Sequence, residues 1–179
     1  MLTSRIARGL AALVTGALLA GTPALADGGG PAGRLETGRQ VLAPFQAGLQ
    51  TALQEGLAQG PLEAIDACRV QAPAIARAAS TSAGPDGEAV EVGRTSHRLR
   101  NPSNAPRDWV RPLLDEYLAE PGNRAPRAVD LGSGRWGYVQ PIFVQPQCLT
   151  CHGSAIAAPL SARIADLYPE DRAVGFRDG

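Results

Sequence analysis

The stretch PGNRAPRAVDLGSGRWGYVQPIFVQPQ, residues 121–147, determines the fold class that we predict for this chain of 179 residues. It reads as two strands joined by the turn Gly132–Ser133–Gly134, which is typical of a β-hairpin. The other elements that the sequence patterns predict are helices at 35–59, 61–80, 106–120 and 162–168 and a strand at 89–101. This order of elements predicts an α+β fold with an antiparallel sheet.

Prolines interrupt both of the predicted N-terminal helices. In the helix at 35–59, Pro44 and Gly48 are candidate kink positions. The helix at 61–80 begins with Pro61, which suits a first helical turn. Pro73 predicts a bend or break in this second helix, because proline has no N–H to donate. Cys68 lies on its apolar face by the three-and-four spacing of helical positions.

The first 26 residues have the order of a secretory signal: an arginine-containing start, a short apolar run and a small-residue site at Ala24–Leu25–Ala26. The apolar run is too short to span a bilayer comfortably, although an uncleaved membrane anchor is the alternative. We therefore expect residues 1–26 to be removed, residues 27–34 to form a flexible start, and residues 35–179 to form one periplasmic domain. We expect no stable membrane insertion after cleavage, because no long apolar segment follows.

The composition limits which binding partners and which metal ligands are expected. The 17 basic residues balance the 17 acidic residues, so binding to nucleic acid or to an anionic membrane is not implied. All the basic residues are arginine, and the one methionine, Met1, would leave with the signal. Neither lysine nor methionine is therefore available to bind a metal in the mature chain.

The motif Cys148–Leu149–Thr150–Cys151–His152 directly follows the predicted hairpin. Two thiols at this spacing reach the two vinyl groups of a haem, and the histidine that follows supplies an axial nitrogen. Covalent attachment of this kind takes place outside the cytoplasm, in agreement with the predicted signal. We therefore predict one haem c per chain, bound covalently through Cys148 and Cys151, with His152 as an axial iron ligand.

Two other sites use the same cysteine spacing. A zinc site needs about four ligands, and only Cys68 and His97 remain to complete one. A thioredoxin-like redox pair should open a helix after a parallel strand, and His152 would then be a coincidence. Haem attachment is favoured because it uses both thiols and the imidazole.

The second axial position of the iron has several candidates. Small electron-transfer cytochromes commonly use histidine and methionine, but the mature chain has no methionine. The candidates are Cys68, His97, a water or vacant position, and a weaker donor such as a tyrosine.

Four stretches resemble the exported single-haem c domains with a PAS-like fold, long grouped as a domain of unknown function. They are EAIDACRVQAPAIA, GRTSHRLRNPSNAPRDW, GYVQPIFVQPQCLTCHG and YPEDRAVGFRDG, in this order over most of residues 62–179. The resemblance implies a PAS-like antiparallel sheet flanked by helices, with the N-terminal helices packing over the covalently bound haem. It also implies that Cys68 is the ligand opposite His152. We expect a further closing strand in such a domain, and the sequence ends at Gly179 before it.

The same resemblance implies a redox sensor or a one-electron carrier that acts with a redox or signalling partner protein, rather than an enzyme. The alternative is a haem protein with an open iron site, either a gas sensor or a peroxidase-like enzyme. Arg94, Arg98 and Arg100 share one face of the predicted strand at 89–101 and are candidate contacts for the haem propionates. A solvated strand face is the other interpretation of these arginines.

Overall fold

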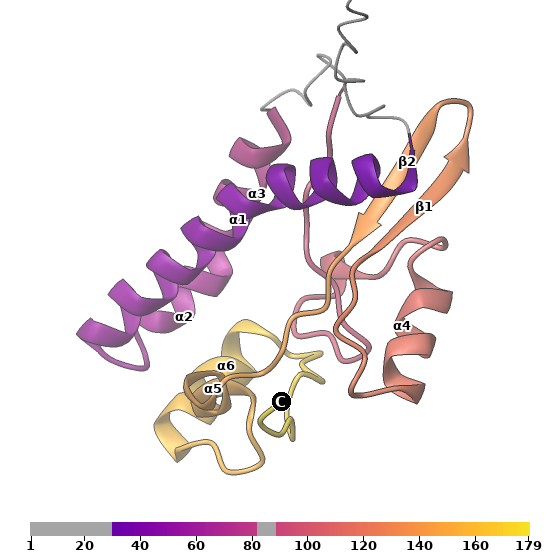
Figure 1. The fold of residues 1–179 in the computed structure, drawn as a ribbon. Helices are drawn as coiled ribbons and strands as arrows, with labels where there is room; N and C mark the ends of the chain where they lie inside the picture. Colours follow the sequence, from indigo (N-terminus) through magenta and orange to yellow (C-terminus); the bar gives the residue numbers. More distant parts are fainter. Residues whose placement is uncertain (1–29, 82–88) are drawn as a thin grey trace, which may run out of the picture.

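The structure is a computed structural model that describes residues 30–81 and 89–179. The predicted signal peptide and its cleavage site lie outside the described residues. Helices and one small antiparallel sheet make up the fold, as the α+β prediction requires (Figure 1). Within the described residues, no helix is both long and apolar enough to cross a membrane.

Helix α1 spans Pro31–Gln59. It begins four positions before the predicted start at Leu35, so the expectation that residues up to 34 are flexible is wrong for 31–34. Proline at the first helical position explains this start, because its fixed φ suits a helix and its missing N–H has no helical partner there. Pro44 lies inside α1, and the helix changes direction along its length in Figure 1.

The second predicted helix forms as three consecutive helical pieces that pack along α1. They are α2 (Ala64–Asp66), the π-helical turn η1 (Ala67–Gln71) and α3 (Ala72–Thr81). The interruption predicted from Pro73 takes the form of this widened turn, placed directly before the proline. Glycines of α1 allow close packing here, because a Cβ on Gly56 would lie 2.8 Å from the Cα of Ala64.

The predicted hairpin is confirmed. Strand β1 (Arg127–Gly132) pairs with β2 (Arg135–Val139), with Val129 opposite Gly137. Ser133 and Gly134 have φ angles of 54° and 76°, and a two-residue hairpin turn of type I′ needs positive φ at both positions. Arg34 of α1 forms an ion pair of 3.1 Å with Asp130 of β1, which joins the helix to the sheet.

The strand predicted at 89–101 does not form. Backbone groups of residues 89–101 make isolated hydrogen bonds instead of the repeated pattern of a sheet. Val92 N donates to Ser80 Oγ at 2.9 Å, and Leu99 O accepts from Arg172 N at 2.8 Å. Side chains also compete locally, since Ser96 Oγ accepts from Arg98 N. The sheet of the described residues therefore has two strands, and residues 89–101 cross the molecule as coil.

The remaining helices are short. They are η2 (Pro102–Asn104), α4 (Arg111–Ala119), η3 (Pro146–Cys148), α5 (Leu149–His152) and α6 (Ala158–Leu167). Helix α4 is shorter than the predicted helix at 106–120, because Pro112 occupies its first turn. Helix α6 begins four residues before the predicted start at 162, again with a proline, Pro159, in its first turn.

A small apolar core brings the second helix to the C-terminal part of the chain. Ile65 of α2 packs with Leu160 and Ile164 of α6, and all three side chains are buried. Cys151 and Tyr168 are partly buried against this cluster. The cluster therefore places the cysteine motif of α5 beside the helix that carries Cys68.

Candidate functional site

Cys148 is the N-cap residue of the short helix α5, and Cys151 lies within that helix one turn later. Pro146 and the 3-10 turn η3 lead the chain into this turn, and Gly153 ends it by donating from its N–H to Leu149 O at 2.9 Å. Both cysteines are half-buried free thiols. A Cβ on Gly153 would lie 2.6 Å from Leu149 O, so this residue permits the tight exit from the motif.

His152 is held through one ring nitrogen. Its Nδ1 lies 2.8 Å from the main-chain oxygen of Ala173. A carbonyl only accepts hydrogen bonds, so Nδ1 carries the proton and the neutral ring has its lone pair on Nε2. Burial lowers the pKa of His152, and the guanidinium of Arg100 lowers it further. The hydrogen bond and the lowered pKa both favour the neutral imidazole, with the lone pair of Nε2 free of the bond to Ala173.

Cys68 lies in the π-helical turn, and its carbonyl has lost its helical donors. Ala72 N donates to Ala67 O, and Pro73 has no N–H. Arg94 supplies the missing donor: its Nη2 donates to Cys68 O at 3.1 Å, and its Nη1 lies 4.0 Å from Cys68 Sγ. Single π-helical turns occur frequently at functional sites.

The structure brings Cys68 close to the cysteine motif. Burial raises the pKa of the Cys151 thiol; Arg100 opposes this shift, while Cys68 and Cys148 add to it. Burial also raises the pKa of Tyr168, and Cys68 is the next largest cause. Cys151 and Tyr168 both pack against the core cluster that contains Ile65, three residues before Cys68, so Cys68 is close enough to act on both groups electrostatically.

His97, the alternative axial residue, lies on an exposed bend. Its ring centroid is 5.6 Å from that of Phe176, and the His152 ring is 6.0 Å from the same phenyl group. Burial and then Arg98 lower the pKa of His97. One phenyl ring thus touches both imidazoles, which places His97 on the side of His152 that Phe176 covers.

The three predicted arginines do not share a strand face, because the strand is absent. Arg94 binds Cys68, as described above. Arg98 donates to Val174 O at 2.9 Å and lies over Phe176. Arg100 donates to Cys151 O at 2.6 Å and forms an ion pair with Asp171. Contact with haem propionates stays a prediction for all three.

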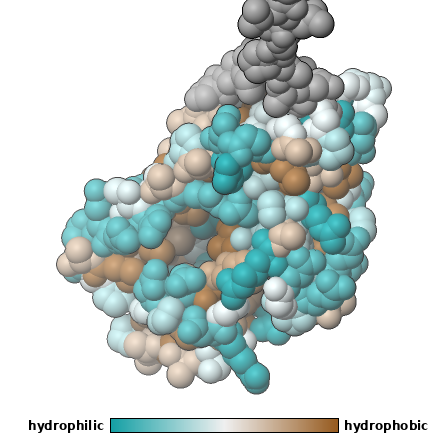
Figure 2. Space-filling model, viewed as in Figure 1, coloured by the Kyte–Doolittle hydropathy of each residue, from teal (hydrophilic) through white to brown (hydrophobic). Residues whose placement is uncertain are grey.

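The surface is hollowed near these groups. Figure 2 shows a hollow between the N-terminal helices and the C-terminal part of the chain, with hydrophobic residues along its rim. A cavity of about 310 Å³ lies against the motif, and it is lined by Pro61, Leu62, Thr150, Ala155, Ala157, Pro159 and Leu160. This cavity joins the loop before α2 to Thr150, one of the two residues between the cysteines.

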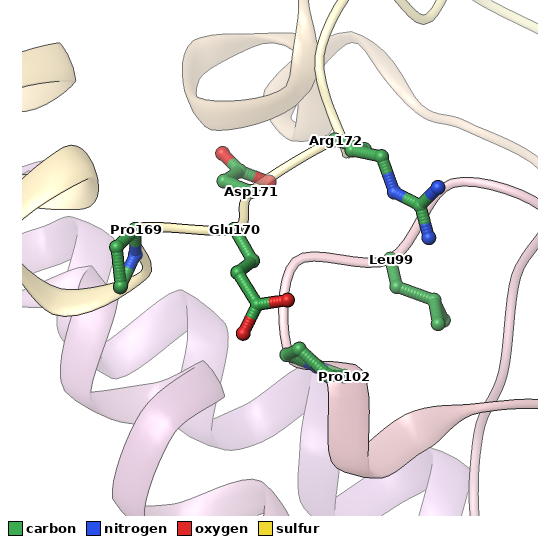
Figure 3. A pocket seen from close by; sticks show the side chains of 6 residues that line it. All are labelled: Leu99, Pro102, Pro169, Glu170, Asp171 and Arg172. Carbon is green, nitrogen blue, oxygen red and sulfur yellow. The ribbon is translucent and has the colours of Figure 1, made fainter.

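A larger cavity of about 490 Å³ lies elsewhere and contains no thiol or imidazole (Figure 3). Its lining residues are Leu99, Pro102, Pro169, Glu170, Asp171 and Arg172. Most of these side chains are exposed, so we assign the chemistry to the smaller, apolar region beside the motif.

The residues of the motif are of the types that a covalently attached haem would need. They offer two thiols on one turn and an imidazole with Nε2 as the metal donor, and a further thiol lies nearby. Within residues 30–81 and 89–179, no three side chains of histidine, cysteine, aspartate or glutamate are grouped as a site for a metal ion. The zinc alternative, which needs His97 and Cys68 beside the motif, therefore has no support.

Sequence reasoning missed the residues that hold His152. Asp171, Ala173 and Phe176 lie after α6 in a segment without regular structure. The acceptor at Ala173 is a main-chain oxygen, which no side-chain pattern can mark. A partner for Arg100 could have been sought among the acidic residues, but the sequence gives no reason to choose Asp171.

Comparison with known proteins shows the family of this chain. A family profile described as Tll0287-like matches residues 34–179, which is most of the chain. The chain belongs to the Tll0287-like family. One solved relative is described as the cyanobacterial heme-protein Tll0287, at 31% sequence identity and a TM-score of 0.40. The match covers 48% of this chain and about half, 51%, of that chain. No curated protein matches this chain.

Proposed function

We propose that this member of the Tll0287-like family binds one haem per chain, covalently through Cys148 and Cys151, with Nε2 of His152 as an axial ligand. The observation that carries the proposal is the hydrogen bond from His152 Nδ1 to Ala173 O. Histidines that bind metals commonly donate their other ring N–H in this way. His152 directly follows Cys151, and the two motif cysteines lie on a single turn. The chain also belongs to a family whose solved relative is described as a heme-protein, which supports the same cofactor.

Cys68 is the residue that we propose as the second axial ligand. Two observations support this proposal: Cys68 contributes to the raised pKa of both Cys151 and Tyr168, and Arg94 contacts its carbonyl oxygen and its sulfur. His97 is the weaker candidate, because Phe176 contacts its ring together with that of His152. Two residues that lie against the same phenyl ring are poorly placed for opposite faces of one flat cofactor.

The role that this donor set supports best is redox sensing or one-electron transfer with a protein partner, outside the cytoplasm. A bound haem supplies one-electron chemistry, and its axial ligands set the reduction potential. The chain contributes a half-buried imidazole and a thiol that binds more strongly as an anion. The PAS-like arrangement stays a prediction, because the sheet of the described residues contains two strands, β1 and β2.

Covalent attachment gives the sharpest test of this function. We expect haem to remain with the denatured wild-type polypeptide and to be lost from the Cys148→Ala/Cys151→Ala variant, since only thioether bonds survive denaturation. Cys68→Ala is the matched control, because it removes a thiol from the same region and should keep covalent haem. Release of all the haem from the denatured wild-type chain would show that the proposed attachment is wrong.

A further inference from the structure

A part-buried ion pair is joined by hydrogen bonds to the residues on either side of the His152 ring contact, Cys151 and Ala173. Arg100 and Asp171 form this pair at 3.1 Å, and their side chains are only 13% and 10% exposed. The guanidinium also donates to two main-chain oxygens, to Cys151 O at 2.6 Å and to Ala173 O at 3.2 Å. Arg100 therefore binds the residue before His152 and the residue to which the His152 ring is bonded.

One carbonyl oxygen receives both donors. His152 Nδ1 donates to Ala173 O at 2.8 Å, and Arg100 Nη2 donates to the same atom. Ala173 is also held through its N–H, which donates to Asp171 Oδ1 at 2.8 Å. Asp171 thus uses one carboxylate oxygen for Arg100 and the other for Ala173, the residue whose carbonyl accepts from His152.

We propose that Arg100, held by Asp171, is a positioning residue for His152 that fixes the direction of the imidazole and weakens its Nδ1 hydrogen bond by sharing the acceptor. The part concerning the metal rests on the proposed function, whereas the part concerning the ring does not. The proposal gives Arg100 a role different from the propionate contact that the sequence suggested.

The location of the acceptor explains why a charged pair is needed. Ala173 is buried but lies in no helix or strand, so no ladder of backbone hydrogen bonds fixes its carbonyl. A guanidinium presents several donors in a rigid planar fork, which can bind two carbonyls and a carboxylate together. A buried arginine without a partner would be costly, and Asp171 removes this cost.

Sharing the acceptor has an electronic consequence for the ring. A charged donor on Ala173 O draws electron density from that oxygen and makes it a weaker acceptor for Nδ1–H. The imidazole then keeps less negative character, and Nε2 is a weaker electron donor. Neutralising the pair should therefore strengthen donation from Nε2 and lower the reduction potential of a bound haem, while the ring itself becomes less well fixed.

The matched control for this test uses Glu170 and Arg172, the two residues that flank Asp171 in the sequence. Arg100→Gln/Asp171→Asn removes the pair without changing the net charge. Glu170→Gln/Arg172→Gln also leaves the charge unchanged and alters two exposed side chains. Figure 3 shows the Asp171 carboxylate directed away from that of Glu170, so the two pairs act on different surroundings.

The direct readout is the Nδ1 proton of His152. The chain has two histidines, so labelling of the full chain with [15N]histidine gives two imidazoles, and a His97→Gln variant assigns them. In the reduced protein we expect the His152 Nδ1 proton to exchange slowly with water. In Arg100→Gln/Asp171→Asn it should exchange faster by about tenfold or more, because Ala173 O is no longer held in place and this loss of order outweighs its gain in acceptor strength. In Glu170→Gln/Arg172→Gln it should exchange at the wild-type rate.

The reduction potential gives a second, independent readout. Spectroelectrochemical titration should find a lower potential in Arg100→Gln/Asp171→Asn and the wild-type potential in the control. Arg100→Lys keeps the charge beside Asp171 without the fork, and it covers the case in which the double variant does not fold. We expect its proton exchange to be faster than in the wild type as well.

Wild-type exchange and wild-type potential in both Arg100 variants would overturn the inference. Covalent haem retained in those same variants would leave the proposed function intact, so the two failures are distinguishable. A wild-type chain without haem would instead overturn the proposed function, and the proton-exchange comparison would still decide the positioning role of Arg100.

Discussion

Arg94 holds Cys68 at two points, with Nη2 donating to the carbonyl oxygen at 3.1 Å and Nη1 lying 4.0 Å from the sulfur. This contact is a consequence of Pro73, which cannot donate to the helical carbonyls before it. The π-helical turn leaves the Cys68 carbonyl open to a donor from outside the helix, and the coil at 89–101 provides it. A backbone irregularity thus fixes a guanidinium beside a candidate ligand.

Replacing Arg94 should disturb the site through Cys68. In Arg94→Gln we expect the ferric absorption bands that depend on Cys68 to weaken or shift, because loss of the donor leaves a part-buried carbonyl unsatisfied at a cost of about 1 kcal/mol. Arg69→Gln is the control, since Arg69 is exposed and adjacent to Cys68 in sequence. Equal effects of the two substitutions would argue against a specific role for Arg94.

The identity of the second axial ligand can be read from two single substitutions. Cys68→Ser should shift the ferric Soret band and raise the reduction potential, because a thiolate ligand stabilises the oxidised iron. His97→Ala should leave both unchanged. The reverse pattern would assign His97 as the ligand.

Carbon monoxide tests the alternative of an open iron site. A stable ligand opposite His152 should make carbon monoxide bind poorly to the reduced wild-type protein. Ready binding of the gas, together with unchanged ferric spectra in Cys68→Ser and His97→Ala, would favour a gas sensor or a peroxidase-like enzyme.

Packing of the hairpin against Trp109 should depend on a glycine. Gly137 of β2 is buried, and a Cβ there would lie 2.5 Å from the Trp109 ring. Gly137→Ala should therefore lower the free energy of unfolding by about 1–3 kcal/mol in urea denaturation, because overpacking displaces the ring. Gly122→Ala, where a Cβ would meet nothing within 4 Å, should have little effect or stabilise slightly.

Export should remove the first 26 residues. Intact-mass analysis of protein from the periplasm should give a chain that begins at Asp27, because Ala24 and Ala26 present the small residues that a signal peptidase requires. Ala24→Leu/Ala26→Leu should block the cut and retain the apolar run. A periplasmic wild-type chain that still carries Met1 would disprove this prediction.

The sequence alone determined the features that depend on local spacing. The cysteine motif, the hairpin turn at Ser133–Gly134 and the interruption near Pro73 each follow from the chemistry of a few adjacent residues. Such features need no distant partner, because backbone geometry and the spacing of side chains are fixed within one or two turns. The family resemblance rests on the same local motifs.

The tertiary structure alone decided which distant groups meet. Residues 89–101 alternate like a strand, but they form coil because their N–H and C=O groups find single partners in α3, in their own side chains and after α6. Arg100 therefore faces Asp171 and Ala173 instead of sharing a face with Arg94. The hydrogen bond from His152 to Ala173 O could not be predicted from the sequence either. Every residue has a main-chain oxygen, and its position depends on how the whole chain packs.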